Sequence, residues 1–261
     1  MSWRDFYTAY INLDHRTDRR EQLEEELKKV GLVAERVRGI YPDEYKGDFN
    51  KIQVMWNRTK GAVGTHFSHV QVLENALSLG KSAFVLEDDV IFSSDIVKRL
   101  DYIQNFLDNN EWDCFWLTST FHVNPPVWHK TGHHAEMPDC PCTLARDVEI
   151  TSDPRILKAY GCFCACGYLV NYKSIPKILK LLDEYVDKSM GIDWLFMMIE
   201  PQLNTYCFVP GMITQRVSKS DISGGYGGWD GFHALGPYFF KDKMEEFDPT
   251  TFNWGEANNK I

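Results

Sequence analysis

The sequence contains no apolar run that approaches the roughly 20 residues of a membrane-spanning helix. Its first residues, Met1 to Asp5, also lack the apolar stretch of a secretory signal peptide. No internal repeat and no low-complexity tract appears in the sequence. We therefore expect a globular protein without a transmembrane segment that resides in the cytoplasm.

Basic residues are outnumbered in this chain. The sequence has 28 lysines and arginines against 37 acidic residues, which gives a net charge of −9. This balance argues against a nucleic-acid partner held by phosphate neutralisation. The 261 residues, 44% of them hydrophobic, suffice for a large core, and we expect one domain over residues 1–261.

The cysteines number seven, and without a signal peptide we expect them to be free thiols. Cys162, Cys164 and Cys166 alternate, so on a strand they would share one buried face. The alternative is a zinc site built on His133, His134, Cys140 and Cys142. Their spacing matches no standard zinc module, so buried thiols are the preferred interpretation.

The most informative stretch covers residues 82–92. Four apolar residues, 83–86, predict a strand buried on both faces, and Glu87, Asp88 and Asp89 follow at its carboxyl end. Ligands of open α/β sheets bind outside the carboxyl ends of strands. Three adjacent carboxylates repel one another and need a cation, and oxygen ligands favour Mg²⁺, Ca²⁺ or Mn²⁺. The alternative is a solvated acidic turn.

The chain opens with a β-α-β pattern. Residues 6–13 predict a strand, an amphipathic helix follows, and residues 33–40 predict the second strand. The turn before the helix offers backbone N–H groups together with Arg16, Arg19 and Arg20, which suit a base, ribose or phosphate. The alternative, a solvated helix N-terminus, is favoured for Arg20.

A further helix is predicted between Gly61 and Gly80, packed beside the acid-bearing strand. It carries His66 and His69 one turn apart. Such a pair can ligate a metal, and it can equally fix a loop through hydrogen bonds.

The α/β alternation continues with a strand at 112–117 and fails between residues 121 and 153. This proline-containing segment predicts a long insertion that forms an acceptor-side wall. A strand at 160–171 and a helix at 174–187 follow.

Asp193 stands alone among apolar residues at the start of a short predicted helix. Burial would raise its pKa, as a general base requires, and the alternative role is a helix N-cap. A strand is predicted at 206–209. Residues 224–233, whose first eight positions hold five glycines and two aromatic residues, predict a C-terminal flap that orders on substrate binding, or a surface loop without function.

Seven short blocks in order resemble glycosyltransferase family 25, which includes lipooligosaccharide and procollagen galactosyltransferases. These blocks, which extend over roughly residues 5 to 222, are Ile11-Asn12-Leu13 with Arg16 and Asp18-Arg19, Gly64 with Ser68-His69, Leu86-Glu87-Asp88-Asp89-Val90, Trp112-Asp113, Gly167-Tyr168-Leu169-Val170, Ile192-Asp193 and Ser220-Asp221-Ile222. The resemblance implies an α/β fold of the GT-A type, a Rossmann-like mixed sheet flanked by helices. It also implies a nucleotide-sugar donor, such as a UDP-hexose, Mn²⁺ (or Mg²⁺) and inversion at the anomeric carbon.

Chemistry and resemblance together suggest roles for the candidate site residues. Asp89 would bind the metal with His233, Asp88 would lie near the ribose, and Glu87 near the donor sugar or a water. Asp193 would take the proton of an acceptor hydroxyl on a glycan or protein. The other residues expected to bind the donor are Asn12, Leu13, Arg16, Arg19 and His69.

We expect residues 1–120 to form the nucleotide-sugar-binding half and residues 121–261 the acceptor-side half. Two functions from other classes compete with the transferase. A metal-dependent phosphohydrolase or nuclease also clusters acids at strand ends, but it usually takes them from several strands. A non-catalytic carbohydrate-binding relative would have no need of Glu87, Asp88, Asp89 and Asp193 together.

Overall fold

A computed structural model describes most of the chain. It covers residues 2–44, 60–118, 149–160, 162, 164–186, 191–221, 226–227 and 240–252. The strands are β1 (Tyr7–Asn12), β2 (Glu35–Arg38), β3 (Ala83–Glu87), β4 (Val90–Phe92), β5 (Cys114–Trp116), β6 (Glu149–Ile150), β7 (Ile156–Lys158), β8 (Gly167–Val170), β9 (Thr205–Phe208), β10 (Ile213–Gln215), β11 (Ser218–Lys219) and β12 (Tyr226–Gly227).

The helices alternate with these strands. The α-helices are α1 (Thr17–Val30), α3 (Lys60–Ser78), α4 (Ile96–Asn109), α5 (Ile175–Glu184) and α6 (Ile192–Ile199). Short 3-10 helices are η1 (Trp3–Asp5), η2 (Pro42–Glu44), η5 (Tyr172–Ser174), η7 (Glu200–Gln202) and η10 (Met244–Glu246).

One mixed sheet of eight strands organises the molecule, in the order β2-β1-β3-β8-β5-β9-β7-β6. Strand β1 is parallel to both β2 and β3. Strand β8 then enters antiparallel between β3 and β5, so its first residues lie beside the last residues of β3. The predicted α/β class, with a mixed sheet flanked by helices, is confirmed.

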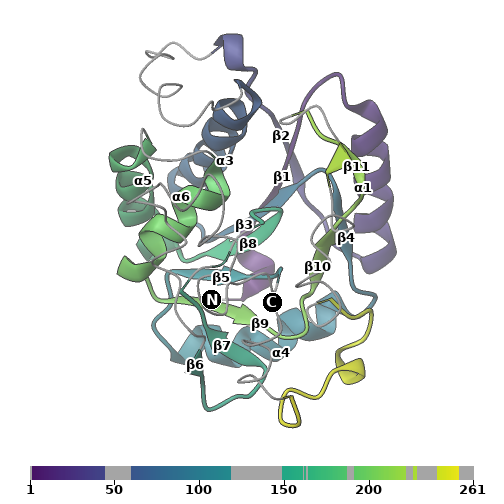
Figure 1. The fold of residues 1–261 in the computed structure, drawn as a ribbon, viewed down its shortest axis with the longest axis vertical. Helices are drawn as coiled ribbons and strands as arrows, with labels where there is room; N and C mark the ends of the chain where they lie inside the picture. Colours follow the sequence, from purple (N-terminus) through teal and green to yellow (C-terminus); the bar gives the residue numbers. More distant parts are fainter. Residues whose placement is uncertain are drawn as a thin grey trace, which may run out of the picture.

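Helices cover both faces of this sheet, as Figure 1 shows for α3, α5 and α6 on one face and α1 on the other. Alternation along β3 explains the two layers, because successive side chains point to opposite faces. Ala83 and Val85 join the core under α3, α5 and α6, whereas Phe84 and Leu86 join the core under α1 and α4. Full burial of each such Phe or Leu side chain contributes roughly 2 kcal/mol to the free energy of folding.

The β-α-β opening forms as predicted, with β1 and β2 inside the expected ranges and α1 between them. Strand β3 covers the predicted residues 83–86 and extends by one residue to Glu87. The helix at residues 61–80 is also confirmed as α3, and Gly80 follows its end with a left-handed φ of 69°. No helix in the described part of the chain has the length and apolarity that crossing a membrane requires.

The strand predicted at 160–171 is shorter than expected. Strand β8 begins only at Gly167, because Cys164 adopts a left-handed φ of 71° that no strand accommodates. The common face predicted for the three cysteines is therefore wrong. Cys162 packs in the core under α3, whereas Cys164 and Cys166 pack in the core under α1 and α4. Their predicted burial as free thiols is confirmed.

Several predicted features lie largely outside the described residues. The four residues of the alternative zinc site belong to the undescribed segment 119–148, and so does most of the predicted insertion. Of the predicted flap, only Tyr226–Gly227 is described, where it forms β12 and pairs with β11. Sequence reasoning did not predict β4, β6, β7, β10, β11 or β12. Strand β10 matters most for function, because its pairing with β4 brings Gln215 beside the acids.

Candidate functional site

The three acids lie at the carboxyl end of β3, beside the carboxyl end of the parallel strand β1. Asn12 ends β1, Glu87 ends β3, and Asp88 and Asp89 form the turn before β4. The register places Ile11 opposite Glu87, so the two strand ends meet at the same edge of the sheet. The Asn12 amide donates to Asp88 Oδ2 over 2.7 Å and to the carbonyl of Arg16 over 3.0 Å. Asn12 thereby joins the acids to the turn before α1.

Arg19, in the first turn of α1, provides the cation nearest to the acids. Its Nη1 lies 2.9 Å from Asp88 Oδ1 and 3.1 Å from Asp89 Oδ2. Its Nη2 donates to Ser218 Oγ at 2.6 Å and to the carbonyl of Lys219 at 2.9 Å. One guanidinium thus connects the acids to β11. Water screens these ion pairs only weakly, because the side chains of Arg19, Asp88 and Asp89 are almost buried.

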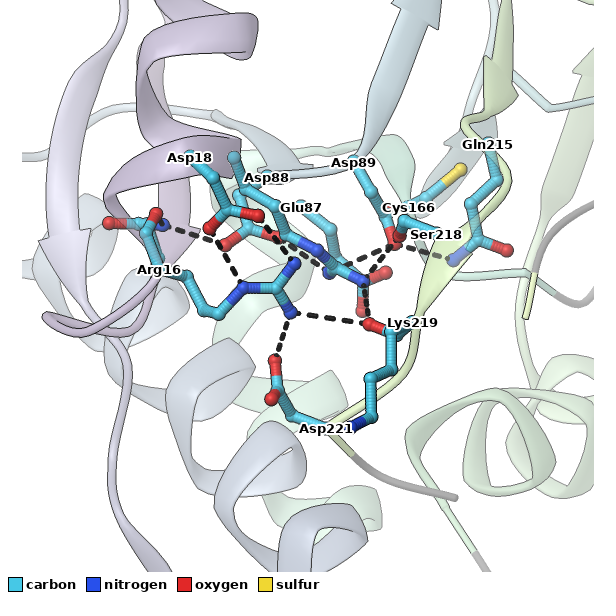
Figure 2. A network of polar contacts seen from close by, with 12 residues as sticks. Arg16, Asp18, Glu87, Asp88, Asp89, Cys166, Gln215, Ser218, Lys219 and Asp221 are labelled. Atoms are coloured by element: carbon cyan, nitrogen blue, oxygen red, sulfur yellow. Dashed lines mark hydrogen bonds and ion pairs between the residues drawn. The ribbon is translucent and has the colours of Figure 1, made fainter. Parts of the chain in front are cut away.

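Arg16 is held by two other acids beside this cluster. It forms a two-pronged pair with Asp18, at 2.9 and 3.0 Å, and its Nη1 donates to Asp221 at 2.5 Å. The arginine lowers the pKa of Asp18 to about 2, mainly through its hydrogen bond. In Figure 2 Arg16 and Asp221 lie beside Lys219, so Arg16 bridges α1 to the segment after β11.

Asp89 is buried and only partly compensated. Gln215 donates to its Oδ2 at 3.1 Å, and the backbone N–H of Arg216 donates to its carbonyl at 2.6 Å. Its other carboxylate oxygen, Oδ1, is buried without a hydrogen-bond partner in the described part of the chain. Burial, followed by the charge of Glu87, raises the pKa of Asp89.

Glu87 contacts the interior rather than Arg19. Its Oε1 lies 3.2 Å from Nε2 of His69, whose Nδ1 lies 2.8 Å from the hydroxyl of Tyr168. Burial, then the neighbouring Asp88, raises the pKa of Glu87. His69 is fully buried in α3, and desolvation lowers its pKa to about 4, so the ring is neutral at physiological pH.

Asp193 lies in the first turn of α6, but it does not cap that helix. The N-cap residue is Gly191, and the Asp193 carboxylate instead accepts the backbone N–H of Ala165 at 2.7 Å. The N-cap alternative is therefore wrong. Burial raises the pKa of Asp193 to about 6, and Glu87 adds to the shift. The hydrogen bond from Ala165 opposes the shift.

The remaining predicted residues differ in what they contribute. Leu13 has no polar side chain, and its carbonyl accepts the N–H of Arg16 at 2.9 Å, which shapes the turn before α1. His233 lies outside the described residues. Sequence reasoning missed the contacts of Gln215, Ser218 and Tyr168. Of these, only Tyr168 stood in one of the seven blocks, and an apolar strand gives no sign that a hydroxyl will meet His69.

Comparison with known proteins decides the family. A family model described as Glycosyltransferase family 25 (LPS biosynthesis protein) matches residues 7–196, well over half of the chain. The chain belongs to glycosyltransferase family 25. A search of curated proteins found no match. The matched region contains Asn12, Arg19, Asp89 and Asp193, and it ends before β9, so Gln215 lies beyond it.

The family 25 assignment agrees with a fold of the GT-A kind, in which helices flank a large mixed sheet. Within the residues that the structure describes, no three His, Cys, Asp or Glu side chains are grouped as ready ligands of one metal ion.

The site should make the stability of this family 25 protein depend on pH. The folded state raises the pKa of Asp89 and Glu87 above their ordinary values, so it binds more protons than the unfolded chain as these groups titrate. Stability therefore falls as pH rises through the folded pKa values. The lowered pKa of His69 makes stability rise with pH instead, but only below the ordinary histidine pKa of 6.5.

We therefore predict that, without divalent cations, the free energy of unfolding falls between about pH 6 and about pH 8. Asp89→Asn should flatten this fall, because it removes one titrating group and one repulsive charge. Urea denaturation at several pH values measures the effect. Asp183→Asn, which alters an exposed carboxylate, is the matched control and should keep the wild-type slope. Equal slopes for Asp89→Asn and the wild type would refute this account of the site.

Proposed function

We propose that this family 25 chain transfers a sugar from a nucleotide-sugar donor to a hydroxyl group of a glycan or protein acceptor. The donor in this proposal is a UDP-hexose carrying galactose, glucose or a similar sugar, and the anomeric carbon inverts. The observation that supports this proposal is an excess of negative over positive charge at the site. Glu87, Asp88 and Asp89 adjoin one another at a strand end, and Arg19 is the only Lys or Arg side chain within ion-pair distance of them in the described part of the chain.

Two buried polar atoms support the presence of a ligand at this ion pair. Asp89 Oδ1 and Arg19 Nε both lack a hydrogen-bond partner among the described residues. Buried polar atoms are rarely left unpaired, and a catalytic role or a bound ion is among the reasons for such atoms. An unused carboxylate oxygen suits a divalent cation, and an unused guanidinium N–H suits a phosphate.

The residues present fit a bound Mn²⁺ or Mg²⁺. Asp89 would hold it through its free oxygen, and His233 is proposed as a further ligand. When bound, such a cation neutralises charge on the diphosphate of the donor. The hard oxygen of Asp89 favours these ions over softer metals.

Two arginines at the start of α1 would bind the donor diphosphate. Arg19 already faces the acids, and Arg16 donates to Asp221 at 2.5 Å. A diphosphate carries more charge than the Asp221 carboxylate, so it would compete with that carboxylate for Arg16. Asn12, fixed between Asp88 and the carbonyl of Arg16, would help to place the nucleoside.

Asp193 is the proposed general base. The acceptor hydroxyl loses its proton to this carboxylate as its oxygen bonds to the anomeric carbon. The bond from that carbon to the diphosphate breaks at the same time, and its electron pair leaves with the nucleoside diphosphate. A pKa of about 6 leaves Asp193 ionised at neutral pH yet more basic than an exposed aspartate.

The competing hydrolase proposal has less support. A phosphohydrolase or nuclease would be expected to draw its carboxylates from several strands, whereas here three come from the end of β3 and its turn. Membership of a glycosyltransferase family also favours transfer over hydrolysis. A non-catalytic sugar-binding relative would have no use for a partly buried carboxylate of raised pKa at Asp193.

We predict that nucleoside diphosphates raise the melting temperature of the wild type in the presence of Mn²⁺ and do so weakly in EDTA. A ligand present at about 100 times its Kd stabilises a protein by roughly 2.7 kcal/mol. Asp89→Asn should abolish the Mn²⁺-dependent part, whereas Asp183→Asn should retain it. A panel of nucleotides in a thermal-shift assay provides the measurement. Stabilisation of Asp89→Asn equal to that of the wild type would rule out the proposed metal role.

We also predict that Asp193→Asn lowers turnover by about 10²- to 10⁴-fold, the usual contribution of a general base. The amide oxygen can still accept the N–H of Ala165, so the melting temperature and donor affinity should stay close to wild type. The wild-type rate should rise with pH through about 6, and this ascending limb should vanish in the variant. Single-turnover rates and melting curves on one preparation test this. A variant with normal turnover would exclude Asp193 as the base.

A further inference from the structure

A buried histidine links the candidate site to the interior of the protein. His69 has no exposed surface, and both of its ring nitrogens are engaged. Nε2 lies 3.2 Å from Glu87 Oε1, and Nδ1 lies 2.8 Å from the hydroxyl of Tyr168. The side chain of Glu87 is 22% exposed, so this pair joins a core residue to the edge of the site.

The two partners determine where the proton of a neutral ring resides. At a pH above the raised pKa of Glu87 its carboxylate is ionised and only accepts hydrogen bonds, so there Nε2 carries the hydrogen and donates it to Glu87. Nδ1 is then the acceptor, and the hydroxyl of Tyr168 donates to it. The chain of donors therefore runs from Tyr168 through His69 to Glu87, and each link fixes the next.

Tyr168 itself is held rigidly. It is fully buried in β8, and its ring lies 5.3 Å from that of Trp116 and 5.0 Å from that of Phe196. The His69 ring stacks on it at 5.7 Å with an interplanar angle of 12°. Phe196 belongs to α6, the helix that carries Asp193, so the same packing connects the residues proposed to serve donor and acceptor.

We infer that His69, oriented by Tyr168, is a positioning residue that fixes the Glu87 carboxylate through a neutral N–H donor. This inference rests on the proposed function, in which Glu87 lies near the donor sugar. A Lys or Arg in the same place would also hold the carboxylate, but it would cancel one of the negative charges on which cation binding depends. A neutral imidazole orients Glu87 and leaves that charge in place.

Two substitutions of one residue separate positioning from packing. In His69→Gln the side-chain amide can place an N–H where Nε2 stood, whereas in His69→Asn the shorter amide reaches only the position of Nδ1. A hydrogen bond to a charged group is worth about 10- to 100-fold in rate if it acts in the transition state. We therefore expect His69→Asn to lower kcat by that factor and His69→Gln to recover most of it.

The affinity for a nucleoside diphosphate, which lacks the sugar, should stay within about twofold of wild type in both variants, since Glu87 is proposed to act on the sugar. A purely structural His69 predicts instead that the melting temperature falls in both variants while kcat per folded molecule is equal in both. Equal kcat values for His69→Asn and His69→Gln would overturn the inference, provided that the wild type transfers sugar.

A measurement that needs no substrate keeps the inference separate from the proposed function. Nitrogen-15 NMR of histidine-labelled protein, recorded at a pH above the raised pKa of Glu87, should show His69 neutral with its proton on Nε2. Tyr168→Phe, which removes only the hydroxyl, should shift the ring towards a mixture of tautomers. A wild-type ring with its proton on Nδ1 would overturn the positioning role. Failure of the wild type to transfer sugar from any donor, with the Nε2 tautomer present, would overturn the proposed function alone.

Discussion

The feature on which the rest of the site depends is a concentration of negative charge in a poorly solvated place. Glu87, Asp88 and Asp89 follow directly on a strand whose residues are buried on both faces. Burial and mutual repulsion raise the pKa of Glu87 and Asp89. Burying an uncompensated charge costs folding free energy, so a cluster of this kind needs a cation beside it.

The surrounding architecture supplies part of that compensation and leaves part of it open. The parallel pair β1 and β3 brings Asn12 to Asp88, and α1 places Arg19 between Asp88 and Asp89. The pairing of β10 with β4 adds the amide of Gln215. None of these contacts satisfies Asp89 Oδ1. The protein thus holds its acids in place while leaving an oxygen available, and the proposed cation binding depends on this oxygen.

Local sequence patterns predicted the parts of this arrangement that depend on neighbours in the chain. The apolar run before Glu87 and the β-α-β opening are such parts, since periodicity alone defines them. The contacts of Gln215 and Tyr168 could not be predicted, because they depend on strands that pair across more than 80 residues. The strand expected around Cys164 failed for a local reason, a left-handed backbone that the alternation of small residues conceals. Asp193 was singled out by its apolar surroundings, but its hydrogen bond to Ala165 follows only from the fold.

The central claim is that this acidic strand end binds a divalent cation together with a nucleoside diphosphate. Electron paramagnetic resonance of Mn²⁺ tests it directly, because the free ion gives a sharp signal that is lost on binding. The account predicts that adding the wild-type protein to Mn²⁺ and UDP removes more of the free signal than UDP alone removes. It also predicts a stoichiometry close to one ion per chain. A free-ion signal that is the same with and without the protein would contradict the account.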